Sequence, residues 1–435
     1  MNVFEFIEKS PEAFHTVATL EDELRRLHYK KLKENEPWKL EAEGKYYVVR
    51  GGTSLLAFQI PNRWKGGFHM VAAHTDSPSF KLKENPEVDV ENHYIKLEVE
   101  TYGGLLMAPW FDRPLSIAGR VIIKDGESCV SRLYDAKRDL LIIPSLAIHM
   151  NRKANDGYTY QVSKDMSPLF AEKGSVRELV AEELGIEQED ILGTDLYLYN
   201  RMKGCQLGKN KEFIAAPRLD DLQCVYGAFQ AFINTSLESA GDRPVNLFCA
   251  FDSEEVGSGT RQGAGSDFLS RTLRRIAGAL GKEGEEYPRI LAESFLISAD
   301  NAHGLHPNYK EKSDENNHPY LNGGVVIKYN GSGKYITDGV SAALIKMLCE
   351  RVKVSYQEYF NHSDIAGGST LGHIATERLS IRGIDIGLAQ LAMHSPYETA
   401  GVKDMEDYIT LLTAFYKGEF HSEDKEESGV SVYSI

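Results

Sequence analysis

Apolar residues recur along this chain with two different periods, and each period predicts a different kind of element. Apolar side chains spaced three and four residues apart predict helices at residues 11–28, 219–233, 340–352 and 405–415. Short apolar runs predict strands at residues 45–50, 54–60, 67–73, 245–251 and 291–298. This alternation of strands and helices favours an α/β fold, with a mixed sheet that helices cover on both faces. The polar residues after Phe420 are expected to form a loose tail.

The hydrophobic pattern changes between residues 79 and 215. Residues 95–102 alternate apolar and polar positions, and residues 117–124 do so more loosely, which is typical of an antiparallel sheet with one exposed face. One helix, near residues 175–184, interrupts this stretch. We therefore predict two domains: an α/β domain made of residues 1–78 and 216–435, and an inserted β-rich domain at residues 79–215.

Composition narrows the range of partners and compartments. The 435 residues are 42% hydrophobic and 26% charged, which is ordinary for a globular protein with large cores. The net charge of -15 argues against nonspecific binding to nucleic acid or to an anionic membrane. No apolar run is long enough to cross a bilayer, and the first residues lack a signal-peptide pattern. The five cysteines are scattered without a CxxC pair, which favours a reducing cytoplasm.

Histidines and carboxylates gather where the predicted strands end. They occupy five short segments: His74-Thr-Asp76, Asp220-Asp221, Glu254-Glu255, Asp300 and His394. Three of these segments directly follow an apolar run, and open α/β sheets bind ligands beyond the carboxyl ends of their strands. Histidine and carboxylate side chains are also the usual ligands of divalent cations such as zinc. The shared placement predicts one metal site assembled from distant segments.

Each segment also has an ordinary structural interpretation when it is taken alone. These interpretations are a turn at His74–Asp76, a helix-start acid at Asp220, a solvated pair at Glu254–Glu255, a strand-ending turn at Asp300 and a core histidine at His394. The balance of charges favours the interpretation that all five segments form one metal site. Two zinc ions balance three carboxylates and one hydroxide, which makes burial of the site tolerable. Without metal the clustered carboxylates would repel one another.

Ten short motifs, in order, carry a resemblance that covers nearly the whole chain. They are Ala73-His-Thr-Asp-Ser-Pro78, Tyr102-Gly-Gly, Trp110-Phe-Asp-Arg113, Ile148-His149, Ala216-Pro-Arg-Leu-Asp220, Asp252-Ser-Glu-Glu-Val-Gly-Ser258, Ser298-Ala-Asp-Asn-Ala-His303, His306-Pro-Asn-Tyr309, Gly368-Ser-Thr-Leu-Gly372 and Ala392-Met-His-Ser395. Through these motifs the chain resembles the aspartyl aminopeptidase family of dizinc exopeptidases. The resemblance implies a zinc-peptidase α/β/α sandwich interrupted by a β-rich dimerisation domain, and dimers that assemble into tetrahedral dodecamers.

The resemblance also implies a role for each site residue. His74 and Asp300 would hold one zinc ion, Glu255 and His394 the other, and Asp220 would bridge both. Glu254 would act as the general base, and Asp76 would orient His74. His149 would reach the active site of a neighbouring subunit, both to bind substrate and to stabilise the transition state.

The implied activity is hydrolysis of the N-terminal residue from peptides with a free amino terminus, with two zinc ions, or Co²⁺ or Mn²⁺, activating water. Lys328 is the candidate for binding an Asp or Glu side chain at that residue, and its alternative is a solvated lysine on a strand edge. A broader aminopeptidase for Leu- or Met-type residues stays open. So does another dizinc amidohydrolase, a carboxypeptidase or deacylase, in which Arg113 or Arg218 would bind a substrate carboxylate. A non-catalytic scaffold is disfavoured, since the metal count does not need Glu254.

Three positions depart from the family pattern. Asp221 stands where the family commonly has Asn, and we expect it to be a helix-start acid without a required role. His373 stands where Pro is usual, and Tyr397 stands where Arg is common in a Ser-x-Arg-Glu motif. The last two positions are expected near the substrate pocket, so they bear on specificity.

Overall fold

A nine-stranded mixed sheet forms the centre of the larger domain in the computed structural model, which describes residues 1–235, 242–418, 421–425 and 430–434. In spatial order its strands are β1 (Lys30–Leu32), β2 (Lys45–Arg50), β3 (Ser54–Gln59), β13 (Asp242–Phe251), β4 (Arg63–His74), β14 (Phe295–Ala299), β18 (Arg382–Gly387), β16 (Val325–Tyr329) and β17 (Tyr356–Phe360). The four central strands β13, β4, β14 and β18 are parallel. Their carboxyl ends therefore lie side by side at one edge of the sheet.

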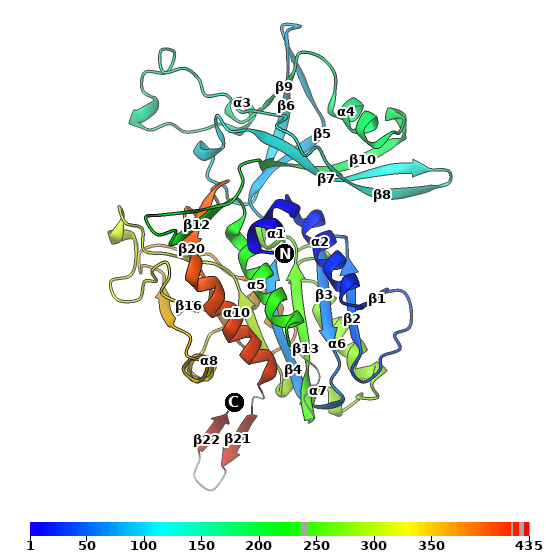
Figure 1. The fold of residues 1–435 in the computed structure, drawn as a ribbon, viewed down its shortest axis with the longest axis vertical. Coiled ribbons are helices and arrows are strands. Elements are labelled where there is room, and N and C mark those ends of the chain that lie inside the picture. Colours follow the sequence, from blue (N-terminus) through cyan, green and yellow to red (C-terminus); the bar gives the residue numbers. More distant parts are fainter. Residues whose placement is uncertain (236–241, 419–420, 426–429, 435) are drawn as a thin grey trace.

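Helices cover both faces of this sheet (Figure 1). One face packs against α1 (Val3–Lys9), α2 (Ala13–Arg26), α5 (Leu219–Ile233), α8 (Gly339–Val352) and α10 (Val402–Lys417). The other face packs against α6 (Phe268–Ala279), α7 (Glu286–Ala292) and α9 (Leu371–Thr376). Because both faces are covered, β4 contains an unbroken apolar run, Met70–Ala73: Val71 and Ala73 face one core, and Met70 and Ala72 face the other. The predicted α/β/α sandwich with a mixed sheet is confirmed.

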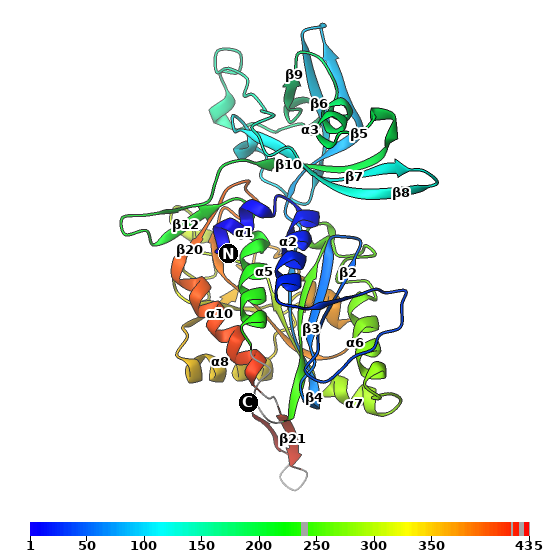
Figure 2. The same cartoon turned by 45° about the vertical axis from the view of Figure 1, so that its right-hand side comes forward.

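A second sheet of six antiparallel strands stands on one end of the larger domain (Figures 1 and 2). Its strands, in spatial order, are β8 (Ser128–Asp135), β7 (Leu115–Asp125), β10 (Ile191–Asn200), β5 (Ser79–Val90), β6 (Tyr94–Tyr102) and β9 (Leu169–Ala171). The short helices α3 (Val162–Asp165) and α4 (Val176–Leu184) accompany it. The sheet has a hydrophobic core of its own, which includes Trp110 and Leu198.

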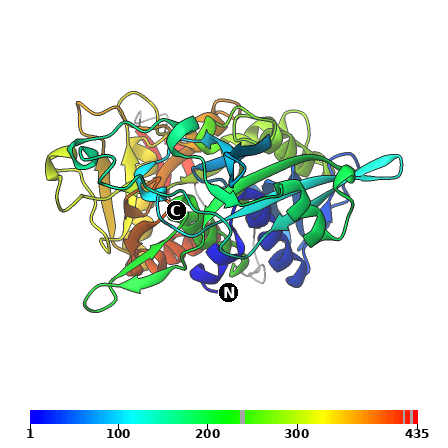
Figure 3. The ribbon, with the colours of Figure 1, turned by 90° about the horizontal axis from the view of Figure 1, so that it is seen from above.

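A third sheet lies between the two, in the order β11 (Cys205–Leu207), β12 (Phe213–Ala216), β20 (Glu398–Gly401), β19 (Ala389–Leu391) and β15 (Ala302–His303). The predicted domain boundary after residue 215 falls inside β12, which pairs with β20 near the end of the chain. Seen from above, the six-stranded sheet lies across the end of the larger domain (Figure 3). The division at residues 78 and 216 and the dimerisation role of the insertion stay predictions.

Two predictions about elements were wrong. The expected strand at 291–298 is divided between the end of α7 and β14, because Ile290 and Leu291 pack from a helix into the same core as a strand would. Of the residues after Phe420, predicted to be a loose tail, β21 (His421–Lys425) and β22 (Val430–Ser434) form an antiparallel pair, and residues 426–429 and 435 lie outside the described residues. Val430-Ser-Val-Tyr-Ser434 contains two β-branched residues and an aromatic one, a composition that favours a strand.

All five cysteines are free thiols, and Cys249 and Cys349 are buried as the sequence predicted. In the described part of the chain, no helix has the length and apolar character that crossing a bilayer requires.

Gly387, at the end of β18, tests how tightly the sheet edge is packed. A Cβ atom at Gly387 would lie 1.9 Å from the carbonyl oxygen of Asp300, so Gly387→Ala must displace the backbone that carries Asp300. We expect a loss of about 1–3 kcal/mol in the free energy of unfolding, together with less bound zinc per chain. Thermal unfolding and metal analysis measure both effects.

Gly193→Ala is the matched control, because Gly193 lies in β10 and a Cβ there would meet no atom within 4 Å. Unfolding of Gly387→Ala at the same temperature as the parent protein would show that the packing at this edge is not tight.

Candidate metal centre

The predicted metal ligands meet at the carboxyl ends of adjacent strands. His74 ends β4, Asp300 directly follows β14, and Glu254 and Glu255 lie in a short 3₁₀ turn, Glu254–Val256, just beyond β13. Asp220 lies in the first turn of α5. His394 follows β19 in a left-handed backbone conformation with φ of 68°. The structure therefore brings all five predicted ligands and Glu254 to one place.

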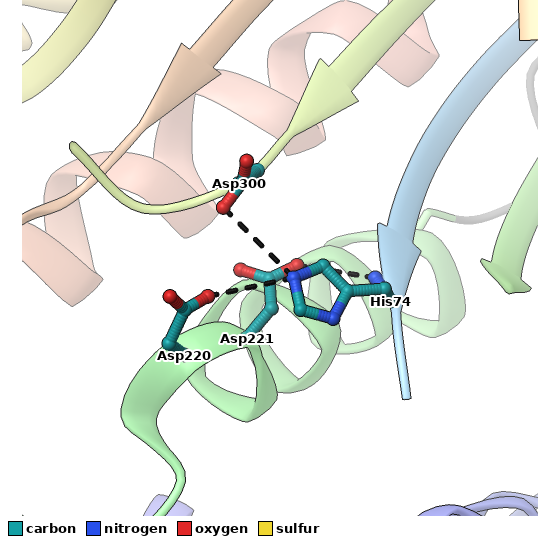
Figure 4. A group of neighbouring side chains, drawn as sticks. All are labelled: His74, Asp220, Asp221 and Asp300. Atoms are coloured by element: carbon teal, nitrogen blue, oxygen red, sulfur yellow. Dashed lines mark hydrogen bonds and ion pairs between the residues drawn. The ribbon is translucent and has the colours of Figure 1, made fainter. Parts of the chain in front are cut away.

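Asp220 stands between two groups of ligands. Its Oδ1 lies 3.4 Å from Nε2 of His74, and that nitrogen lies 3.9 Å from Oδ1 of Asp300. Its Oδ2 lies 3.6 Å from Nε2 of His394, and that nitrogen lies 3.4 Å from Oε2 of Glu255. The two oxygens of one carboxylate thus face two different histidines. Figure 4 shows the first group, with the three aspartates around the ring of His74.

The two histidines are held in the same way. Nδ1 of His74 lies 3.0 Å from the backbone oxygen of Asp76, and Nδ1 of His394 lies 2.7 Å from the backbone oxygen of Gly104. A carbonyl oxygen only accepts hydrogen bonds, so each Nδ1 carries a hydrogen and donates it. Each Nε2 then faces carboxylates, and either a proton or a cation must lie between them.

The donor set fits a divalent cation. Asp220 is 2% exposed, and its Oδ1 accepts no hydrogen bond from any residue that the structure describes. The groups His74–Asp220–Asp221–Asp300 and Asp220–Glu255–His394 each present ligand atoms within 4.8 Å of one another. Nitrogen and carboxylate donors of this kind suit zinc, cobalt or manganese.

Burial and mutual repulsion shift the pKa values at the centre. Burial, opposed by His74 and assisted by Asp300, raises the pKa of Glu254 to about 8. Burial and the charge of Asp220 raise the pKa of Glu255 well above its usual range. Burial alone would lower the pKa of His74, but the charge of Asp221 and the adjacent carboxylate of Asp220 raise it well above 6.5. Protons therefore occupy this cluster when no cation does.

Asp76 supports the centre chiefly through its carboxylate. Its Oδ1 accepts the backbone N–H of Glu254 at 3.2 Å, and its Oδ2 accepts that of Glu255 at 3.1 Å. The hydroxyl of Tyr102, at the end of β6, donates to the same Oδ2 at 2.8 Å. Asp76 contacts the ring of His74 mainly through its backbone oxygen, since its Oδ1 lies 3.4 Å from Nδ1. The orienting role predicted for Asp76 stays a prediction, but its carboxylate fixes the turn that carries both glutamates.

Sequence reasoning missed Glu398, which is 1% exposed at the start of β20. Its Oε2 accepts the backbone N–H of Asp220 at 2.9 Å, and its Oε1 accepts that of His394 at 2.8 Å. One carboxylate thus holds the backbone of a ligand from each side of the centre. The signal was present in Ser395-Pro-Tyr-Glu398, in which Glu398 matches the final acid of the Ser-x-Arg-Glu motif.

Asp221 is not the helix-start acid that we expected. Asp220 and Asp221 have non-helical backbone angles, so regular helix begins only after them. Asp221 is fully buried, and its Oδ2 accepts the backbone N–H of His74 at 3.1 Å.

Lys328 is likewise not a solvated lysine on a strand edge. Its strand, β16, lies between β18 and β17, and the residue is 2% exposed. Nζ donates to the backbone oxygens of Asp300 and Asn301 at 3.1 and 3.0 Å, and to Oδ2 of Asp300 at 3.2 Å. Burial lowers the pKa of Lys328, but Asp300 and further anionic groups raise it overall, so the amine stays charged.

The other predicted residues lie apart from this cluster. His149 is exposed in a turn of the inserted domain, and no described residue forms a hydrogen bond or ion pair with it. Arg113 donates to the backbone of Pro109, and Arg218 donates to Ser10 and Ile7. The hydroxyl of Tyr397 donates to the backbone oxygen of Lys203 at 2.7 Å, on the side of β11.

Metal binding should weaken as the pH falls. A cation displaces protons from His74 and Glu255, and both have pKa values above their usual range, so protons compete for these groups near neutrality. We expect zinc affinity to fall by more than about tenfold between about pH 8 and about pH 6. Competition with a chromophoric chelator at each pH measures it. An affinity that does not change over this range would contradict the assignment of these groups as ligands.

Comparison with known proteins agrees with this geometry. Residues 6–416 match the family described as "Aminopeptidase I zinc metalloprotease (M18)". A protein of Clostridium acetobutylicum named "Probable M18 family aminopeptidase 2" is 42% identical over 414 residues, which covers 92% of this chain and 94% of that protein. A protein of Pseudomonas aeruginosa with the same name is 40% identical over 425 residues, covering 95% of this chain and 97% of that protein.

Solved structures share the whole fold. The "Cryo-EM structure of the Ape4 and Nbr1 complex" contains a chain with a TM-score of 0.91 and 32% identity, covering 95% of this chain and 84% of that chain. The "Structure of S. cerevesiae mApe1 dodecamer" gives a TM-score of 0.83 and 29% identity, covering 95% of both chains. The family match over nearly the whole length, together with the clustered ligands, shows that this chain belongs to the M18 family of zinc aminopeptidases.

Proposed function

We propose that this aminopeptidase binds two divalent cations per chain and hydrolyses the first peptide bond of substrates with a free amino terminus. The observation that carries the proposal is the carboxylate of Asp220, whose two oxygens face His74 on one side and His394 on the other. Each histidine has a further carboxylate, Asp300 or Glu255, on its own side. The family description supports zinc, and Co²⁺ or Mn²⁺ are the alternatives.

When bound, two divalent cations would lower the pKa of a water molecule and withdraw electrons from the scissile carbonyl. Glu254 accepts the proton of the attacking water and delivers it to the leaving amine. Before a cation binds, burial raises the pKa of Glu254 to about 8. Asp76 holds the backbone of Glu254 in place for both transfers. The free amino group of the substrate lies against the carboxylates of the centre, which explains why only the first residue is removed.

We propose that subunits complete one another's active sites. His149 lies in the exposed segment 144–161 of the insertion, beside apolar side chains that are also exposed: Leu146 (58%), Ile148 (48%) and Met150 (71%). Exposed apolar groups of this kind are typical of protein contact surfaces. A solved relative is described as a dodecamer. We infer dimers that assemble into a tetrahedral dodecamer, in which His149 binds the substrate of a neighbouring subunit and stabilises the oxyanion. The free cysteines support a reducing, cytoplasmic location.

We further propose that the enzyme prefers Asp or Glu as the first residue of its substrate, on the basis of Lys328. Lys328 is a charged amine buried beside Asp300 at the centre. A substrate carboxylate that reached Nζ would have to share it with Oδ2 of Asp300. The three hydrogen bonds that fix Nζ favour the second candidate, a broader aminopeptidase that accepts Leu- or Met-type residues.

The carboxypeptidase and deacylase alternatives gain little support. Both need a cation that binds a substrate carboxylate, and the two candidate arginines already donate to backbone oxygens. Arg113 binds the loop before it, and Arg218 ties the turn between α1 and α2 to the start of α5.

A panel of aminoacyl-anilides with Asp, Glu, Leu, Met and Lys tests the proposed function. Each is assayed with a chelator and after zinc, cobalt or manganese is restored, and N-acetylated versions serve as controls. We expect metal-dependent release from the free amines and none from the acetylated compounds. Cleavage of the acetylated compounds would instead support a deacylase or endopeptidase.

Glu254→Gln tests the proton transfers. The variant keeps the shape of the side chain and both neighbouring ligand groups, so it should bind metal normally. Its kcat should fall by about 10²–10⁴-fold, because an amide cannot accept the proton. Metal content and steady-state kinetics are measured together. Normal turnover would remove Glu254 from the role of base.

Lys328→Met tests whether the enzyme prefers an acidic first residue or accepts Leu- and Met-type residues equally. If Nζ binds an acidic side chain, kcat/KM for Asp-anilide should fall by about 10–100-fold relative to Leu-anilide. This factor corresponds to the free energy of one charge-assisted hydrogen bond. An equal fall for both substrates, with weaker metal binding, would mean that Lys328 positions Asp300 and that the enzyme is the broader aminopeptidase.

A further inference from the structure

We propose that Asp221 is a fourth acidic group of the metal centre, and that its charge strengthens binding of the cation on the side of His74 and Asp300. The proposal rests on the proposed function only in requiring that a divalent cation binds here. Asp221 presents a ligand atom within 4.8 Å of those of His74, Asp220 and Asp300. Figure 4 shows its carboxylate beside the ring of His74, on the side where Asp220 lies.

The carboxylate of Asp221 lacks an ion-pair partner among the residues that the structure describes. The residue is fully buried, and no lysine, arginine or histidine that the structure describes forms an ion pair with it. Its Oδ2 accepts the N–H of His74, while its Oδ1 accepts no hydrogen bond from the described residues. The thiol of Cys224, which follows in α5, donates to Asn301 at 3.5 Å. A buried carboxylate is costly unless a counter-charge compensates it, and a cation beside His74 supplies one.

Lys328 explains why a fourth carboxylate is useful. Its Nζ lies 3.2 Å from Oδ2 of Asp300, so part of the negative charge of that ligand is already neutralised. This would weaken Asp300 as a ligand for a cation. Asp221, on the same side of the centre, adds one negative charge and offsets the one positive charge of Lys328. The balance between two cations and the remaining acids is thereby restored.

Replacement by asparagine isolates the charge. Asparagine has nearly the same shape as aspartate, and its side-chain oxygen can still accept the N–H of His74. Asp221→Asn therefore removes the charge alone, whereas Asp221→Ala also removes the hydrogen bond. Asp404→Asn is the matched control: Asp404 is 1% exposed and accepts the backbone N–H groups of Asn322 and Gly324, but it belongs to none of the metal groups.

The test is equilibrium binding of Zn²⁺, Co²⁺ and Mn²⁺ to the full chain after metal removal, by calorimetry with chelator competition. We expect Asp221→Asn to weaken the binding of one cation per chain by about 10–100-fold and to leave any second cation unchanged. The factor should be similar for all three metals, because the charge is the same. Asp221→Ala should lose at least as much affinity and unfold at a lower temperature. Asp404→Asn should bind every metal like the parent protein.

Two results would overturn the proposal. They are unchanged affinity in Asp221→Asn, whether or not its unfolding temperature falls, and an equal loss of affinity in Asp404→Asn. None of these measurements depends on peptide turnover, so a failure of the proposed aminopeptidase activity in the anilide panel stays distinguishable from a failure here.

Discussion

Negative charge concentrated inside a protein is the constraint on which the rest of this structure depends. Asp220, Asp221 and Asp300 present ligand atoms within 4.8 Å of one another, and Asp220 lies equally close to Glu255. Such a cluster is stable only where positive charge and N–H donors compensate it. Two further buried carboxylates beside this cluster, Asp76 and Glu398, are compensated by the chain's own backbone. Asp76 and Glu398 each accept two backbone N–H groups, and all four groups belong to segments that carry a ligand or the proposed base. Compensation of charge and placement of the ligands are therefore accomplished by the same hydrogen bonds.

The inserted segment contributes two hydrogen bonds to the metal centre. Tyr102, at the end of β6, donates to Asp76, and the carbonyl oxygen of Gly104 fixes the ring of His394. Only residues 75–78 separate β4 from β5, so a shift of the six-stranded sheet would be transmitted directly to His74. Contacts between subunits through the insertion would act on the same residues.

Residues whose role follows from their position at a strand end were predictable from the sequence. His74, Glu254, Glu255 and Asp300 follow apolar runs, and both the runs and the acids are visible without a structure. Glu398, Asp221 and Lys328 were missed or misjudged because contacts distant in sequence decide their roles. The prediction of a strand at 291–298 was wrong for a related reason, since a short apolar run fits a buried helix end as well as a strand. Hydrophobic period predicted the strands β2, β3, β4 and β13, the antiparallel insertion and one helical layer, since the predicted helices correspond to α2, α5, α8 and α10. The strands β16, β17 and β18 and the helices α6, α7 and α9 of the other layer were not predicted individually.

The order of strands in the main sheet has a consequence for synthesis of the chain. β13 lies between β3 and β4, so the strand that ends in His74 gains its neighbour only after residue 251 has been made. His394 emerges later still, and α10, which packs on the same core, follows it. A chain still attached to the ribosome therefore lacks a complete set of ligands until residue 394 has been made. The order of the ligands along the chain thereby delays assembly of the metal centre until the strands β4, β13, β14 and β19 have all been made.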